Sequence, residues 1–262
     1  MDMEALEVDE AAEAKRIVGF IADMVRGARA QGVVLGLSGG VDSAVTGALC
    51  VEALGKARVL TILMPSAHTP REDVEDARKM AKEWGVTLEE LEIDEIVRVI
   101  MKTAKIDGER IPKGNLQARV RMAILYAFAN SKSLLVAGTG DRSESELGYF
   151  TKFGDGGADF LPIAHLYKTQ VRVLGAHLGL PDRVVKKAAS PQLWPGQKAS
   201  DELHADYDVL DPLLYLLFEK RVTLERAASE SGAGKELVEK VMRMHDSTEH
   251  KRRTPPSLRP KA

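Results

Sequence analysis

The sequence has little cysteine, few aromatic residues and almost no net charge, and each shortage excludes a class of protein. Cys50 is the only cysteine, so an intrachain disulfide and a cysteine-rich metal cluster are excluded. Lys and Arg number 37 and Asp and Glu number 39, a balance that argues against a dedicated binder of nucleic acid or of an anionic membrane. Aromatic residues make up 5%, so the core must be mostly aliphatic.

Targeting and membrane-spanning segments are also missing from the sequence. Residues 1–15 are acidic and contain neither the basic region nor the apolar region of a secretory signal. No apolar run approaches the roughly 18 residues that cross a bilayer. We therefore expect a soluble cytoplasmic protein, and 262 residues suit one large domain with a full core.

Strand patterns alternate with helix patterns along the first half of the chain. Strands are predicted at 33–37, 58–64, within 86–93 and at 133–139. Helices are predicted at 9–31, 43–54, 71–84, 94–104 (with Asp94 as N-cap) and, after a turn at 107–114, at 115–130. The alternation predicts an α/β fold of Rossmann-like type, with an open, mainly parallel sheet and helices on both faces.

The pattern changes after Gly140. Residues 148–162 are crowded with Gly, Asp and Thr and lack periodicity, which predicts a long loop that closes over a site and excludes water. Helices are predicted at 168–178, 182–187, 208–220, 222–230 and 234–245, before a basic, proline-rich tail. Because no linker interrupts the chain, we expect one domain over residues 1–262, with an α/β core at about 10–200 and a mostly helical part at about 201–262.

The segment Ser38-Gly-Gly-Val-Asp-Ser43 lies between a predicted buried strand and a predicted helix. At that position the unpaired amides and the dipole of the helix favour an anion. Gly39 and Gly40 allow the backbone to approach phosphate oxygens closely. Asp42 would repel a bare phosphate, so its presence indicates a bridging cation, most simply Mg²⁺.

Two other interpretations of this segment are less favoured by its context. The pattern G-x-x-x-x-G-K-[ST] is absent, so this is not a Walker A loop that grips a phosphate through its own lysine. The alternative without a function is a Ser/Gly turn in which Asp42 caps an ordinary helix. The strand before the turn and the helix after it favour the phosphate site.

The segment resembles the pyrophosphate loop of the ATP pyrophosphatases, and a second segment narrows the resemblance. Residues 138–168, GTGDRSESELGYFTKFGDGGADFLPIAHLYK, are similar to the GT-x(4)-E…GYFTKYGDGG-x-D-x-x-P…LYK signature of the NAD synthetases. Asn115–Met122, Leu193–Gln197 and Glu249–Arg253 also match that family. The resemblance extends over residues 10 to 260 and implies an ammonia-dependent ligase in which two chains form a homodimer with the substrate site at the subunit interface.

The resemblance implies which residues hold ATP and Mg²⁺. Asp42 and Glu144 correspond to the family's magnesium ligands, and both follow strands whose carboxyl ends share one edge of the sheet. The other implied ATP contacts are Gly36, Leu37, Ser38, Gly39, Gly40, Val41, Ser43, Thr139, Lys168 and Ser190. A lysine such as Lys168 near the α-phosphate would neutralise the charge that builds during attack on phosphorus.

Deamido-NAD contacts are implied for Arg119, Lys152, Asp159, His250 and Lys251. Tyr126, two helical turns beyond Arg119 on the same side, is expected to stack on the same substrate. The alternative for Arg119 and Tyr126 is an exposed helix face, and the alternative for the basic residues at 250–253 is a solvated run of charge. The family often places an aromatic residue against the substrate where this chain has Met24, with Phe20 one turn earlier, so that contact is not expected to be the usual one.

The implied reaction is the ATP-dependent amidation of deamido-NAD to NAD, the last step of NAD biosynthesis. The nicotinate carboxylate attacks the α-phosphorus, which gives an acyl-adenylate and pyrophosphate, and ammonia then expels AMP. Asp42, Glu144, Lys168 and Asp159 are the candidate catalytic residues, Asp159 as the group that binds ammonium or accepts its proton. Another adenylating enzyme, such as one that thiolates tRNA, and a nucleotide sensor without catalysis are the alternatives.

Overall fold

A four-stranded parallel sheet organises the computed structural model, which describes residues 6–106 and 110–258. The strands are β1 (Gly32–Gly36), β2 (Val59–Leu63), β3 (Thr87–Glu90) and β4 (Leu134–Val136), in the order β3-β2-β1-β4. Every pair is parallel, with Val34 opposite both Leu60 and Val136. The α/β class predicted from the sequence is confirmed.

The apolar strands bury both faces of the sheet because successive side chains point to opposite sides. Val33 and Leu35 of β1 pack into one core cluster, and Val34, between them, packs into the cluster on the other face. All three side chains are fully buried. An unbroken apolar run is therefore what this central strand requires.

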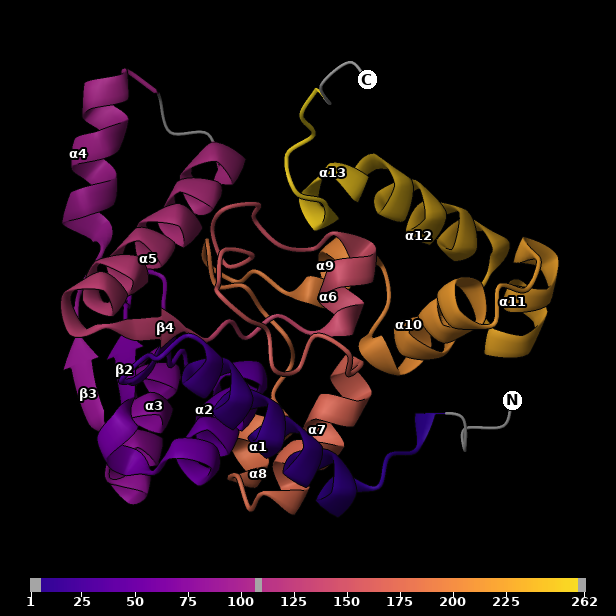
Figure 1. Ribbon diagram of the computed structural model, residues 1–262. Coiled ribbons are helices and arrows are strands. Elements are labelled where there is room, and N and C mark those ends of the chain that lie inside the picture. The colour runs from indigo at the N-terminus through magenta and orange to yellow at the C-terminus, as the bar shows by residue number, and fades with distance from the viewer. Residues whose placement is uncertain (1–5, 107–109, 259–262) are drawn as a thin grey trace.

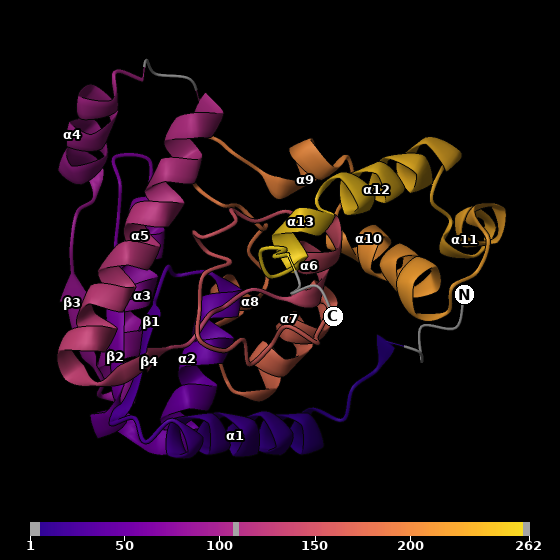
Figure 2. The same ribbon diagram turned by 45° about the horizontal axis from the view of Figure 1, so that its top comes forward.

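Helices cover both faces (Figures 1 and 2). One face is covered by α1 (Glu10–Gly27), α2 (Val41–Leu54), α3 (Arg71–Trp84), α7 (Lys168–His177) and α8 (Asp182–Val185). The other is covered by α4 (Asp94–Ala104) and α5 (Arg110–Lys132), which pack on each other. A short 3₁₀ turn, η2 (Lys56–Arg58), leads into β2.

The C-terminal helices enclose a core cluster of their own, to the right of the sheet in Figure 1. They are α9 (Ala199–Leu203), α10 (Tyr207–Leu214), the π-helical turn η3 (Tyr215–Glu219), α11 (Leu224–Ser231), α12 (Lys235–Ser247) and α13 (Glu249–Arg252). Leu147 of α6 (Arg142–Leu147) and Tyr167 pack into the same cluster, so the two parts of the fold are joined through the segment after β4.

Several local predictions were wrong. Asp94 is not an N-cap: Ile93 holds that position, and the Asp94 carboxylate instead accepts a hydrogen bond from the Ala67 amide at 2.6 Å. Helix α5 begins at Arg110 rather than 115, so part of the predicted turn is helical, while 107–109 lie outside the described residues. Helices α6, α9 and α13 were not predicted, because they are too short to show periodicity.

No helix in the described part of the chain is both long and apolar enough to cross a membrane. Cys50 is buried, and burial raises the pKa of its thiol to about 12.

The strand order creates a switch point between β1 and β4. From β1 the chain proceeds through α2 to β2 on one side, and it returns after β3 to form β4 on the other. In open α/β sheets ligands bind outside the carboxyl ends of the strands at such a point. A ligand-binding site is therefore expected at the loops that follow β1 and β4.

Candidate active site

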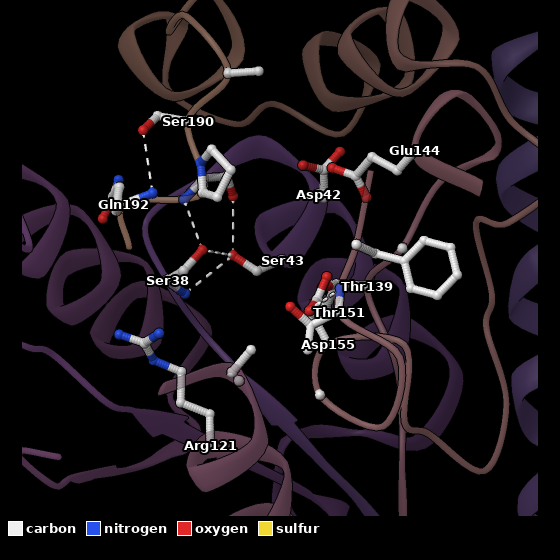
Figure 3. Close-up of a pocket in the computed structure, with 18 of the residues that line it drawn as sticks. Ser38, Asp42, Ser43, Arg121, Thr139, Glu144, Thr151, Asp155, Ser190 and Gln192 are labelled. Carbon is white, nitrogen blue, oxygen red and sulfur yellow. Dashed lines mark hydrogen bonds between the residues drawn. The ribbon is translucent and has the colours of Figure 1, made fainter. Parts of the chain in front are cut away.

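A cavity of about 420 Å³ opens at the carboxyl ends of β1 and β4. Its walls include the loop between β1 and α2, the end of β2, one side of α5, the segment from β4 into α6, the loop at 148–157, and the segment at 184–199. Figure 3 shows Asp42 beside Glu144, with Ser38 and Ser43 together in another part of the cavity and Thr139 near Thr151 and Asp155. Segments far apart in sequence thus share one chamber, of a size that suits a nucleotide.

The loop after β1 is held in shape by its own serines. Ser43 Oγ accepts a hydrogen bond from the Ser38 amide at 3.1 Å and donates one to the Gly40 carbonyl at 3.0 Å. Gly39 has a φ of +82°, and a Cβ there would overlap the carbonyl oxygen of Asp73. Gly40 caps α2 without a side-chain hydrogen bond, so the first amides of that helix remain available to an anion.

Three carboxylates surround the ammonium of Lys168, the first residue of α7. Lys168 Nζ lies 2.7 Å from Asp42 Oδ1, 2.9 Å from Asp141 Oδ2 and 3.1 Å from Glu144 Oε1. The side chains of Lys168 and Asp141 are buried, while 23% of Asp42 and 24% of Glu144 is exposed. The two partly exposed carboxylates both line the cavity. The arrangement carries more negative than positive charge.

Burial and charge shift the pKa values of this cluster. Burial, together with the nearby Asp141 and Asp42, raises the pKa of Glu144 to about 8 against the opposing effect of Lys168. Burial also raises the pKa of Asp141. Burial acts to lower the pKa of Lys168, but the three carboxylates outweigh it and hold that pKa well above its usual value. A proton or a second cation would relieve the excess negative charge.

A buried hydrogen-bond network fixes Lys168 and Glu144. Asp141 Oδ1 accepts from the Glu144 amide at 2.8 Å, and Glu144 Oε2 accepts from the Asp141 amide at 3.4 Å, which forms a capping box. Asp211 of α10 accepts from Ser143 Oγ at 2.6 Å and from the Thr169 amide at 2.8 Å, and Ser143 Oγ in turn accepts from the Lys168 amide. The starts of α6 and α7 are therefore tied together.

The chemistry of this cluster fits Mg²⁺. In the described residues no group of three or more His, Cys, Asp or Glu side chains could hold a metal ion alone. Mg²⁺ commonly uses one or two carboxylates and takes its other ligands from water and substrate phosphates. Asp42 and Glu144 supply two such carboxylates beside the phosphate-type loop, in a cluster with surplus negative charge.

The structure brings the sequence-predicted ATP contacts into one place. All but one of them line the cavity: Gly36, Leu37, Ser38, Gly40, Val41, Asp42, Ser43, Thr139, Lys168 and Ser190, together with Glu144. The exception is Gly39, which turns against Asp73 instead. Ser190 Oγ donates to the Gln197 carbonyl at 2.6 Å and accepts from the Gln192 amide at 3.2 Å, which shapes its loop (Figure 3).

The predicted deamido-NAD contacts lie mostly outside the cavity, in two groups. Arg119 donates to the Lys152 carbonyl at 3.4 Å, and Lys152 Nζ donates to the His250 carbonyl. Tyr126 donates to Asp159 Oδ1 at 3.1 Å. These five residues do not line the cavity, whereas Lys251 does.

The contacts of Asp159 and Lys251 show what else these residues do. The second carboxylate oxygen of Asp159 accepts from the Val136 amide at 2.7 Å, so Asp159 also fixes the edge of β4. Lys251 Nζ donates to the carbonyls of Gly148 and Phe150, both at 2.8 Å, and so ties the C-terminal helix to the loop beside the cavity.

Sequence reasoning missed several polar residues of the site. Asp141 is one, although its spacing to Glu144 is the capping-box pattern and could have indicated a helix start. Arg121 and Asp155, which line the cavity, are two others. Arg121 donates to the Met64 carbonyl at 3.0 Å, and burial lowers its pKa to about 10 despite the nearby Asp155. No local pattern distinguishes Arg121 from an exposed helix arginine.

The chain is similar in sequence to one family of known proteins. The sequence model of a family described as NAD synthase matches residues 13–255. The chain is 49% identical over 260 residues to the NH(3)-dependent NAD(+) synthetase of Hyperthermus butylicus, covering 99% of this chain and 94% of the relative. It is 46% identical over 244 residues to the enzyme of the same name from Staphylothermus marinus, covering 92% and 89%.

Solved structures of NAD and NMN synthetases are also similar to this chain. The NMN synthetase of Francisella tularensis superposes with a TM-score of 0.85 at 31% identity, covering 96% of this chain and 99% of the other. The NH3-dependent NAD synthetase of Campylobacter jejuni, in complex with a nitrate ion, superposes with a TM-score of 0.82 at 29% identity, covering 97% and 100%.

Proposed function

The chain belongs to the NAD synthase family, and we propose that it amidates deamido-NAD with ammonia, with ATP as co-substrate, to give NAD, AMP and pyrophosphate. The observation that carries the proposal is the meeting of Asp42 and Glu144 at Lys168 beside the Ser38–Ser43 loop. This places two metal-type ligands and one buried cation at a ready-made anion site.

The proposed first step activates the nicotinate carboxylate. The amides at the start of α2 and the hydroxyls of Ser38 and Ser43 hold the phosphates, and Asp42 and Glu144 would hold Mg²⁺, which supplies charge neutralisation at the phosphates. Lys168, which is buried between Asp42 and Glu144, would act on the α-phosphate through its positive charge. The carboxylate oxygen attacks the α-phosphorus, the bond to the bridging oxygen breaks, and pyrophosphate leaves.

In the proposed second step ammonia attacks the acyl carbon of the adenylate, loses a proton, and AMP leaves with the bridging oxygen. Free ammonia as donor is supported by the names of the relatives, whose length this chain nearly covers. Asp159 stays our candidate for the group that receives this proton. In this proposal the substrate extends between two subunits and brings the reacting ammonia to Asp159.

An exposed apolar surface supports a homodimer. Three exposed apolar side chains lie on α4, namely Ile96, Val99 and Ile100, and two more, Ile106 and Ile111, follow along the chain; all five are 39 to 64% exposed. Ile96, Val99 and Ile100 follow helical spacing on one side of α4, so they form a stripe. Apolar side chains gathered on one exposed helix face are typical of protein contacts. We propose that two copies meet here and that the Arg119 and Tyr126 groups on α5 serve the shared substrate site.

We place the reaction in the cytoplasm, where ATP is supplied.

One assay tests the proposed function. The protein is mixed with Mg²⁺, ATP, deamido-NAD and ammonium, and the nucleotides are separated and identified by mass. We expect NAD, AMP and pyrophosphate in equal amounts; ADP, or no product, would contradict the proposal. A parallel reaction with nicotinic acid mononucleotide tests the substrate suggested by the name of the Francisella neighbour, and it is expected to be the poorer substrate.

A further inference from the structure

The Ser38–Ser43 loop contains no lysine, but a lysine from a distant segment reaches it. Lys187, just after α8, lines the cavity, and its Nζ donates to the Gly39 carbonyl at 3.3 Å. Lys168 meets the loop at its other end, through Asp42. Two ammonium groups therefore contact the loop, Lys187 at Gly39 and Lys168 at Asp42.

A buried carboxylate of α3 holds Lys187 in place. Asp73, whose side chain is 3% exposed, pairs with Lys187 and also accepts a hydrogen bond from Gln192. The neighbouring Asp76 is paired with Arg183, and its nearer oxygen is 3.6 Å from Lys187 Nζ. Asp73 thus fixes the position of Lys187, while Arg183 supplies the charge that Asp76 needs.

The hydrogen bonds of Lys187 leave part of its capacity unused. An ammonium has three N–H donors, and Asp73 and the Gly39 carbonyl take two of them. Asp76 forms an ion pair with Lys187 at 3.6 Å, but this distance is too long for a hydrogen bond. The Lys187 side chain is 28% exposed, and it lines the cavity. One N–H therefore remains for a ligand.

We propose that Lys187 binds the β- and γ-phosphate groups of ATP, the part that leaves as pyrophosphate. This inference rests on the proposed function and deepens it: Asp73 positions the lysine that the loop itself lacks. Lys168 neutralises negative charge at the α-phosphate. Lys187 stabilises the negative charge that accumulates on the leaving pyrophosphate as the bridging bond breaks.

Calorimetry of Lys187→Met with inorganic pyrophosphate, at a fixed Mg²⁺ concentration, tests the proposal. We expect pyrophosphate and ATP to bind about 10- to 100-fold more weakly, because one charge-assisted hydrogen bond to phosphate is lost. AMP, which lacks the β- and γ-phosphates, should bind as in the wild type. Lys186→Met is the matched control, because Lys186 is 74% exposed and pairs with Asp182 at 2.6 Å.

Two further measurements guard against a folding defect. The double variant Asp73→Asn/Lys187→Met removes both charges of the pair and should show the same selective loss. In the wild type, pyrophosphate should slow the reaction of Lys187, and not that of Lys186, with an amine-reactive reagent followed by mass spectrometry. These experiments do not require NAD formation, so they are independent of the assay above. Pyrophosphate affinity within about 3-fold of the Lys186→Met control, an equal loss of AMP binding, or no protection of Lys187 would overturn the proposal.

Discussion

Asp42 Oδ1 lies 2.7 Å from Lys168 Nζ, although Asp42 follows β1 and Lys168 begins α7 in the second half of the chain. The pair joins the Ser38–Ser43 loop to the hydrogen-bond network that runs through Asp141, Ser143 and Asp211. Because the lysine is buried among three carboxylates, its removal has consequences for both stability and metal binding.

Lys168→Met is expected to lower the free energy of unfolding by about 3 to 5 kcal/mol, since three neighbouring carboxylates lose their cation. For the same reason Mg²⁺ should raise the melting temperature of the variant more than that of the wild type. Thermal unfolding at several Mg²⁺ concentrations measures both effects. An equal response of the two proteins to Mg²⁺ would show that the carboxylates do not share a cation site.

Asp42→Asn and Glu144→Gln are each expected to reduce NAD formation by about 100-fold or more, because each removes one anionic oxygen ligand from the proposed magnesium site. Asp182→Asn is the control: its side chain is 81% exposed and contacts only Lys186 among the ion pairs of the described residues. The measurement is the initial rate at saturating substrates. Normal rates in either variant would show that the metal assignment is wrong.

Asp211 predicts a dependence of stability on pH. Burial raises its pKa to about 7, above the value of about 3.9 for an unfolded chain. Between these values the folded state binds more protons than the unfolded state, so the contribution of Asp211 to stability is greatest below about pH 4 and is lost as the pH rises to about 7. The total is on the order of 4 kcal/mol.

Urea unfolding of the wild type and of Asp211→Asn, from pH 5 to pH 8, checks this dependence. The stability advantage of the wild type should shrink as the pH rises, because Asn does not titrate. A constant difference across this range would mean that the pKa of Asp211 is not raised.

Gly39→Ala is expected to cost more stability than the same change at another left-handed glycine. Gly39 has a φ of +82° and would place its Cβ on the Asp73 carbonyl, so backbone strain and a steric clash add. Gly232 has a φ of +72° and open space around it, so Gly232→Ala should cost only the strain of about 1 kcal/mol. Denaturant unfolding compares the two, and equal losses would show that the loop and α3 do not pack closely.

Ile100→Glu is expected to convert a dimer into a monomer, because it buries a charge in the proposed interface on α4. Val173→Glu on α7 is the matched control, since Val173 is 47% exposed away from that stripe. Light scattering after size-exclusion chromatography gives the mass of each. A monomeric wild type, or a dimer that survives Ile100→Glu, would contradict the proposed interface.

The sequence by itself determined the parts of this protein that depend on neighbouring residues. The apolar run at β1 and β2 predicted buried parallel strands because such strands need both faces apolar, and α3 and α4 were predicted with the bounds that the structure has. The two glycine-containing motifs indicated the family, which the comparisons confirm. Roles for individual residues stay predictions.

Only the tertiary structure decided how distant side chains meet. No local pattern pairs Lys168 with Asp141, Asp211 with Ser143, or Lys187 with Asp73, because each pair joins segments that approach only after the sheet and the C-terminal helices have packed. Asp94 is another residue that local sequence alone does not explain. Its position suits a helix N-cap, but its carboxylate instead accepts a hydrogen bond from a backbone amide of another loop. Periodicity and capping act over one or two turns, whereas burial and charge neutralisation depend on the whole chain.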